Sequence, residues 1–270
     1  MLKINVLVSS MNYSFQNNKK LFIPSTNVSY IIINQITSHS DKDVDEYFTN
    51  REDIGIFNYQ EKGLSKSRNR AISQSTGDIC LIADDDVYYD ENIFQILREK
   101  YESDKNIEAI TFQDKYAQEI GKKNYIHKEF LHNKYTALKV TSFEISFRRN
   151  AVVNNEMYFD ERFGLGAKIP LGEENIFLGD ILDKKMKILH IPEFLVNHPH
   201  ESTGCLYDKL SGFNKGVVFA RIFPSLTAYF ICIIFALRKR NKLNSKISFQ
   251  GYIKALISGA YFYFKNMKQC

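Results

Sequence analysis

Cysteine is scarce in this chain, and the few that occur lie far apart. The four are Cys80, Cys205, Cys232 and Cys270, and no two of them form a CxxC pair. This spacing indicates neither a zinc ribbon nor a framework of disulfides. We therefore expect the protein to work in a reducing cytosol.

Long apolar runs and early basic tracts are also missing. The first fifteen residues hold only a short apolar run without a cleavage site, so we expect no secretory signal peptide. No basic tract occurs within the first 215 residues, which argues against nucleic acid as a partner. The apolar stretches near the C-terminus are each about 13 residues long, below the roughly 20 that a membrane-crossing helix needs.

What is present is the composition of an ordinary globular protein. The chain has 270 residues, of which 44% are hydrophobic and 25% are charged, enough for one large domain or two small ones. The formal net charge of +5 is modest and suits an anionic ligand or an anionic lipid surface.

Short β-branched runs recur along the first two thirds of the chain and alternate with helical patterns. Several runs are almost continuously apolar, which is typical of strands covered on both faces. This alternation predicts an α/β fold with a mixed, mostly parallel sheet flanked by helices. The predicted strands are Ile4–Val8, Val28–Ile33, Gly55–Tyr59, Ile79–Ala83, Glu108–Phe112, Phe143–Phe147 and Ile188–Ile191.

Three helices are predicted between these strands. One covers Gly63–Ser75 and places Leu64, Ala71 and Ile72 on one face. A second starts with Asp90 as its N-cap, and a third covers Glu174–Lys185 with acids in its first turn.

The composition changes near residue 216, so we expect an α/β domain in residues 1–215 and a helical region in residues 216–270. The region is apolar and aromatic and contains the basic cluster Arg238, Lys239 and Arg240. Interfacial helices with basic flanks would attach the protein to the anionic inner leaflet. The alternative is a pair of helices that simply covers the sheet.

Three consecutive aspartates, Asp84, Asp85 and Asp86, follow the apolar run Ile79–Ala83. Ligands bind at the carboxyl ends of strands in open α/β sheets. Adjacent carboxylates repel one another, so the cluster either is fully solvated or shares a cation. A divalent metal, Mg²⁺ or Mn²⁺, would relieve the repulsion and bind substrate phosphates.

Arg68 lies on the apolar stripe of the helix over residues 63–75, where a cation needs a partner. A phosphate held between Arg68 and a metal on Asp86 would satisfy both features. A structural salt bridge from Arg68 to one of the aspartates is the other interpretation.

The segment GLSKSRNRAISQSTGDICLIADDDV, residues 63–87, resembles the corresponding segment of family 2 inverting glycosyltransferases, which have the Rossmann-like GT-A fold. The resemblance implies that Asp84 binds the nucleoside side of a nucleotide-sugar donor and that Asp86 holds a metal on its diphosphate. Arg68 and Asn69 match the family's Arg-Asn pair, and Asp85 borders the same donor site.

A second segment, residues 158–193, is similar to the acceptor loop of the same family and its Gly-Glu-Asp motif. Gly164, Gly166 and Gly172 suit a tight loop over an acceptor sugar. Glu173 and Glu174 stand where the family has Glu-Asp, and the second acid is the usual base. The resemblance therefore implies Glu174 as the general base, with Glu173 as the second choice.

His198 and His200 follow the predicted strand Ile188–Ile191. The family often places a late histidine near the metal or the diphosphate, so one of the two is a candidate metal ligand. A surface histidine without a ligand role is the competing interpretation.

The N-terminal quarter departs from the family pattern, because the acids that usually form the base pocket are missing. Ser9, Asn34 and Gln35 stand there instead and can contact a base through neutral hydrogen bonds. This variation resembles a subgroup found in bacterial capsule and exopolysaccharide synthesis. The resemblance covers residues 1 to about 210.

The sequence thus predicts a metal-dependent, inverting glycosyltransferase that moves a sugar, with a UDP-sugar as the expected donor, to a saccharide acceptor. A lipid-linked acceptor would explain a membrane-facing tail on a cytoplasmic, peripheral enzyme. Competing interpretations are a glycoside hydrolase, a phosphohydrolase with an aspartate nucleophile, and a non-catalytic nucleotide-sugar-binding or scaffold subunit.

Overall fold

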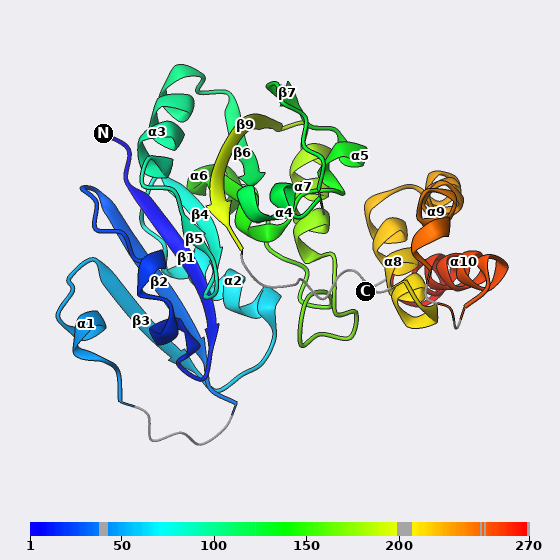
Figure 1. Cartoon of the computed structure of the whole chain (residues 1–270), viewed down its shortest axis with the longest axis horizontal. Coiled ribbons are helices and arrows are strands. Elements are labelled where there is room, and N and C mark those ends of the chain that lie inside the picture. The colour runs from blue at the N-terminus through cyan, green and yellow to red at the C-terminus, as the bar shows by residue number, and fades with distance from the viewer. Residues whose placement is uncertain (38–42, 122, 199–206, 244, 246, 269–270) are drawn as a thin grey trace.

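The computed structural model describes residues 1–37, 43–121, 123–198, 207–243, 245 and 247–268. One mixed sheet runs through the larger part of the molecule, with helices on both faces, and the C-terminal helices lie together at one end (Figure 1). The strands are β1 (Ile4–Met11), β2 (Val28–Gln35), β3 (Ile54–Tyr59), β4 (Ile79–Asp84), β5 (Tyr88–Tyr89), β6 (Ile107–Asp114), β7 (Phe130–Leu131), β8 (Ile145–Arg148) and β9 (Lys187–Asn197). The α-helices are α1 (Glu46–Thr49), α2 (Leu64–Gln74), α3 (Ile93–Ser103), α4 (Lys115–Glu119), α5 (Lys134–Ala137), α6 (Arg149–Val153), α7 (Glu173–Asp183), α8 (Lys209–Ile222), α9 (Ser225–Lys239) and α10 (Phe249–Asn266).

The strand order is β3-β2-β1-β4-β8-β6-β9-β5, with β7 paired to β9. The longest pairings, among β1, β2, β3 and β4 and between β6 and β9, are parallel, while β8 runs antiparallel to both its neighbours. The predicted mixed α/β architecture is therefore confirmed. In the register, Ser9 lies beside Ile33 and Asp84, so the carboxyl ends of β1, β2 and β4 meet at one edge.

Both faces of the sheet are buried, which explains why its strands read as continuous apolar runs. In β4, Ile79 and Leu81 pack into one core with α3, whereas Cys80 and Ile82 pack into the other with α2 and α7. Alternate side chains of a strand point to opposite faces, so a strand covered twice needs apolar residues at every position.

Several predicted strands are longer in the structure, such as β9, and two other predicted elements begin differently. The run Phe143–Phe147 is not one strand, because a 3-10 turn over Ser142–Glu144 precedes β8. Asp90 is not the N-cap of the next helix either. Its side chain accepts from the Asn92 backbone in a turn, and α3 begins only at Ile93.

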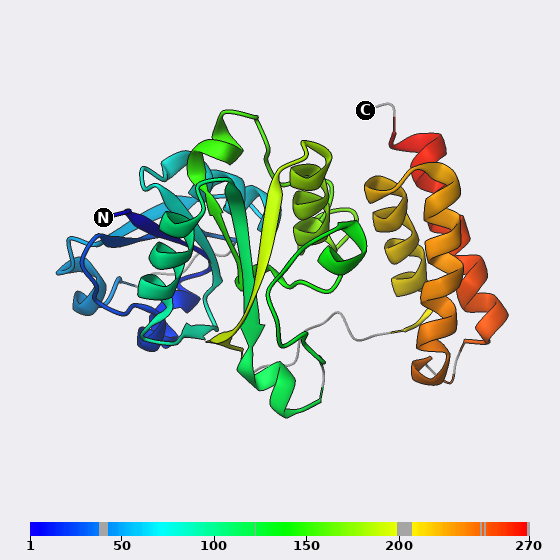
Figure 2. The ribbon, with the colours of Figure 1, turned by 90° about the horizontal axis from the view of Figure 1, so that it is seen from above.

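The C-terminal helices α8, α9 and α10 lie beside α7, beyond the sheet (Figure 2), and share an apolar core with Phe163, Ile169 and Ile176. Gly216 and Gly259 allow α8 and α10 to touch, since a Cβ at either position would lie 1.9 Å from a backbone oxygen of the other helix. The change in composition near residue 216 falls inside α8. Within the described ranges, none of the helices is both long and apolar enough to cross a membrane.

Candidate active site

A cleft of about 690 Å³ opens at the carboxyl edge of β1, β2 and β4 and extends between α7 and the start of α8. It collects most of the residues that the sequence singled out. Those that line it are Ser9, Gln35, Asp84, Asp85, Asp86, Glu173, Glu174 and His198.

The three aspartates at the end of β4 point to three different partners. Asp84 accepts hydrogen bonds from Arg68 at 3.0 Å and from the Ser142 hydroxyl at 3.3 Å. Asp85 accepts a hydrogen bond from the Ser14 hydroxyl, and burial raises the pKa of its carboxyl. Among the described residues of this cleft, three acids form ion pairs: Asp84, Asp86 and Glu173. Of these, Asp86 has the most exposed side chain, at 40%. The repulsion among the three is therefore reduced by separate contacts, and the side chain of Asp86 is more open to the cleft than that of Asp84.

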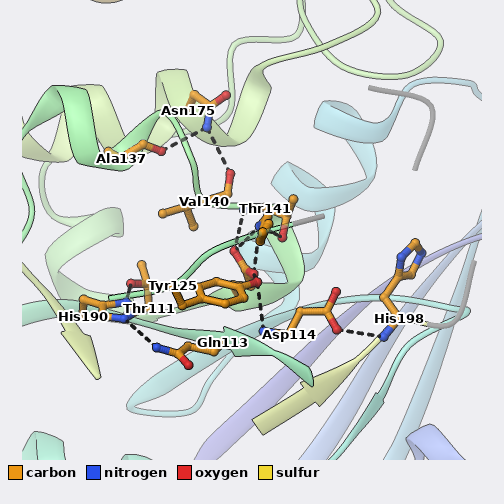
Figure 3. A network of polar contacts seen from close by, with 12 residues as sticks. Thr111, Gln113, Asp114, Tyr125, Ala137, Val140, Thr141, Asn175, His190 and His198 are labelled. Atoms are coloured by element: carbon orange, nitrogen blue, oxygen red, sulfur yellow. Dashed lines mark hydrogen bonds and ion pairs between the residues drawn. The ribbon is translucent and has the colours of Figure 1, made fainter. Parts of the chain in front are cut away.

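His198 is held beside Asp86 by contacts on three sides. Its Nε2 lies 3.2 Å from Oδ2 of Asp86, and its ring stacks on Phe143 with centroids 4.8 Å apart. Figure 3 shows Asp114 at the backbone nitrogen of His198, with the imidazole turned away from it; the nitrogen donates at 3.4 Å. Burial alone would lower the pKa of His198, but the Asp86 carboxylate outweighs it and the pKa is raised. His200 lies outside the described residues.

Arg68 lies behind the wall of the cleft and joins two of its acids. The side chain is only 1% exposed, and its guanidinium donates to Glu173 at 2.7 Å and to Asp84 at 3.0 Å. The structural salt bridge is thus present, and Arg68 does not line the cleft. Arg68 is buried on α2 together with Ala71 and Ile72, on the helix stripe that the sequence predicted to be apolar.

Asn34 and Asn69, both predicted to contact the donor, do not line the cleft either. Asn69 pairs with the backbone of Phe159, donating at 2.9 Å and accepting at 2.8 Å. Asn34 is fully buried, accepts from the Tyr13 backbone at 2.9 Å and donates to Asn58 at 2.8 Å. Their amides satisfy neighbouring polar groups that the local fold would otherwise leave unpaired.

Ser9 and Gln35 line the cleft but also bind the protein around it. Ser9 accepts a hydrogen bond from the Ser67 hydroxyl at 2.9 Å. Gln35 makes two hydrogen bonds of 3.1 Å with the backbone of Gly63, just before α2. Both side chains therefore fix the start and first turn of α2 against the sheet edge.

The paired glutamates at the start of α7 have different surroundings. Gly172 precedes them with φ of +81°, and a Cβ there would meet Val218 of α8 at 2.7 Å. Glu173 is buried in its ion pair with Arg68. Glu174 is half-buried at the cleft wall, and its pKa is raised well above the ordinary glutamate value by burial and then by the charge of Glu173.

A buried network supports the turn that carries Phe143. Glu144 accepts from Thr141 N and from Lys123 Nζ at 2.8 Å, and the Tyr125 hydroxyl also donates to it. Figure 3 shows Tyr125 reaching from this cluster to the backbone of Asp114. Because Asp114 contacts His198, the network joins two walls of the cleft.

Several residues of the cleft were not predicted from the sequence. Ser14, Lys62 and Ser142 line it, and so do Asp208 and Leu210 at the start of α8. Ser14 follows β1 and Ser142 precedes β8, and a serine near the end of a strand is only a weak indication of a binding site. The α8 residues carried none, because they reach the cleft only through the packing of α8 on α7.

The carboxylate and imidazole groups in the cleft suit a divalent cation that takes most of its ligands from a bound phosphate and from water. Asp86 and His198 form a close carboxylate and imidazole pair. Across the described part of the chain, no group of three His, Cys, Asp or Glu residues could hold a metal alone. Mg²⁺ and Mn²⁺ commonly bind through one or two protein ligands plus phosphate oxygens and water.

One comparison with known proteins identifies a family, and another shows a shared fold. Residues 20–158 match the model of the family described as Glycosyl transferase family 2. The structure is similar to that of Staphylococcus aureus TarS 1-349 in complex with UDP, with 15% identity, a TM-score of 0.60, and coverage of 99% of this chain and 73% of that one. It is also similar to the mannosyltransferase PcManGT from Pyrobaculum calidifontis in complex with GDP-Man and Mn²⁺, with 13% identity, a TM-score of 0.58, and coverage of 98% and 71%. At these identities the likeness shows a shared fold. No curated protein sequence matches the chain.

Proposed function

Because the chain belongs to glycosyl transferase family 2, we propose that this glycosyltransferase moves a sugar from a nucleotide-sugar to a saccharide acceptor in one displacement with inversion. Glu174 is the general base that takes the proton from the acceptor hydroxyl. The competing glycosidase and phosphohydrolase interpretations do not account for the family match. A non-catalytic subunit that kept the fold would match the family as well, and replacing Glu174 separates it from an enzyme.

The observation that carries this proposal is the difference between the surroundings of Glu173 and those of Glu174. Glu173 is buried, and its carboxylate is engaged in an ion pair with Arg68. Glu174 lines the cleft, and its raised pKa makes it a stronger base than an ordinary glutamate. Adjacent acids in different environments commonly divide their roles in this way.

In this proposal the donor diphosphate binds at the edge formed by Asp84, Asp85 and Asp86. Asp86 and His198 would hold a divalent cation, Mn²⁺ or Mg²⁺, which when bound offsets charge on the departing diphosphate. The Arg68 contact keeps Asp84 oriented at the end of β4. The Mn²⁺ in the mannosyltransferase complex supports a metal in this family.

A UDP-sugar is the first donor to test. TarS 1-349 has been solved with UDP and with UDP-GlcNAc, whereas the mannosyltransferase holds GDP-Man. Ser9 and Gln35 are the predicted base contacts that line the cleft here.

The acceptor is proposed to be lipid-linked, in bacterial surface polysaccharide synthesis at the cytoplasmic face of the membrane. Gly166, Gly172 and Leu165 line the side of the cleft next to Glu174, together with Leu210 of α8.

Replacing Glu174 by Gln tests the proposal, because it removes the base and keeps the shape. We expect kcat to fall about 10² to 10⁴-fold, with UDP affinity unchanged and an inverted product anomer in the residual reaction. The control is Glu193→Gln, since Glu193 is an exposed glutamate on β9. Unchanged turnover in the Glu174 variant would refute the role of Glu174, and loss of UDP binding would indicate a structural role instead.

A further inference from the structure

Helix α9 has an apolar face that no described part of the chain covers. Its inner side packs on α8 and α10 through Ala228, Ile231, Cys232 and Ala236. Its outer side carries five apolar residues. They begin at Leu226 and continue four, seven, eight and eleven positions later, a spacing that places them on one stripe of the helix. These residues, the α9 stripe, are 39% to 75% exposed and comprise Leu226, Phe230, Ile233, Ile234 and Leu237.

Charge is distributed very unevenly between this region and the rest of the protein. Residues 209–270 contain eleven Lys and Arg and not one Asp or Glu, whereas residues 1–208 contain 25 basic and 31 acidic residues. A region of one sign beside an apolar stripe indicates a partner that is both anionic and apolar.

The basic end of α9 lies close to the mouth of the cleft. Helices α8 and α9 are joined by the short connection at Phe223 and Pro224 and run in opposite directions, as Figure 2 shows. The Nζ of Lys239, at the end of α9, lies 5.6 Å from the ring centre of Tyr207, and the next residue, Asp208, lines the cleft.

We propose that the α9 stripe is a docking surface for an anionic lipid bilayer. The stripe lies in the plane of the membrane with its apolar side chains among the acyl chains, and Arg238, Lys239, Arg240 and Lys242 contact the headgroups. A bilayer with anionic lipids offers acyl chains for the apolar stripe and negative headgroups for the basic residues. Each basic residue near such a surface adds to the attraction. The proposal stands on α9 alone; only its consequence, a cleft that meets a lipid-linked acceptor, rests on the proposed function.

Charge also argues against a second copy of the chain as the occupant. Pairing two α9 stripes would bring two strongly basic regions together, and like charges at close range oppose association. Nucleic acid is disfavoured because five exposed apolar side chains occupy the centre of the surface.

Co-sedimentation of the full chain with vesicles tests the proposal. The probes are phosphatidylcholine vesicles and vesicles with a third of the lipid replaced by phosphatidylglycerol. We expect binding to the anionic vesicles, weakened by salt, and about tenfold or greater loss of binding in the double variant Ile234→Ser with Leu237→Ser. The double variant Arg238→Gln with Arg240→Gln should lose binding to a similar degree.

Matched variants separate docking from general effects. Ile120 and Leu131 are 49% and 54% exposed, close to the 48% and 56% of Ile234 and Leu237, so changing both to Ser is the apolar control. Lys105→Gln with Lys115→Gln removes two exposed charges elsewhere. Both control variants and Glu174→Gln should bind vesicles as the parent protein does.

Three results would overturn the proposal. The parent protein could stay in solution with anionic vesicles, or the stripe variant could bind them as well as the parent does. The third is a dimer in light scattering that the stripe variant abolishes, without vesicle binding. Activity on a soluble acceptor, measured in the same variants, would show whether the proposed reaction stands independently.

Discussion

Arg68 donates a hydrogen bond of 2.7 Å to Glu173, 105 residues further along the chain, inside the wall of the cleft. The same guanidinium reaches Asp84 at 3.0 Å, so one buried cation joins the carboxyl edge of β4 to α7, the helix that carries the proposed base. The position of Glu174 therefore depends on α2 as well as on α7.

Replacing Arg68 by Met should destabilise the fold strongly. Two carboxylates would lose their partner, and breaking a buried ion pair typically costs about 3–5 kcal/mol. Denaturant unfolding measures this cost. Arg70→Met on the same helix is the control, because Arg70 is exposed and its 3.4 Å contact with Glu61 is a surface ion pair, which contributes little to stability. Equal losses in the two variants would contradict the role given to Arg68.

The rate of transfer should rise with pH over a range above that of an ordinary glutamate. A general base works only when deprotonated, and burial together with the Glu173 charge raises the pKa of Glu174. In Glu173→Gln the charge is gone and Arg68 is partly released, so the pKa of Glu174 falls and the rise in rate moves to lower pH. The pH profile of kcat/KM measures both changes. A profile that does not move, or moves to higher pH, would count against Glu174 as the base.

Glu144→Gln should weaken both the fold and donor binding. Glu144 is buried and pairs with Lys123, Tyr125 and the Thr141 backbone, which fixes the turn that carries Ser142 and Phe143 into the cleft. We expect a loss of about 2–4 kcal/mol in stability and a several-fold weaker affinity for UDP. Glu129→Gln breaks an exposed ion pair with Lys100 and should change neither. If UDP affinity is the same in both variants, the turn does not position the donor site.

The sequence was sufficient where the signal is local. Continuous apolar runs predicted the buried strands, and Arg68 on an apolar stripe predicted a buried partner for its charge. The partner Glu173 could not be predicted from spacing, because the contact depends on the left-handed turn at Gly172 and on how α7 meets the sheet. Local spacing also misassigned Asp90 as a helix cap, since an aspartate can equally accept a bond in the turn before a helix.

Two residues that were assigned to the donor do not line the cleft. Asn34 was assigned because its amide can bind a base, and Asn69 because it matches the family's Arg-Asn pair, but amides bind backbone groups equally well. Which of the two occurs depends on chain segments far away, such as Phe159 for Asn69. The contribution of α8 to the cleft depends in the same way on the fit of Val218 against Gly172.

The central claim is that the edge at Asp84 and Asp86 holds the donor diphosphate through a divalent cation. Calorimetric titration with UDP, and in parallel GDP, with and without Mn²⁺, tests it on the parent protein and on Asp86→Asn. The control is Asp90→Asn, which changes an exposed acid just outside the cleft. We predict nucleotide binding that requires Mn²⁺, weakens at least about tenfold in Asp86→Asn and is unchanged in Asp90→Asn. Binding that is independent of both Mn²⁺ and Asp86, or no binding of either nucleotide, would contradict the account.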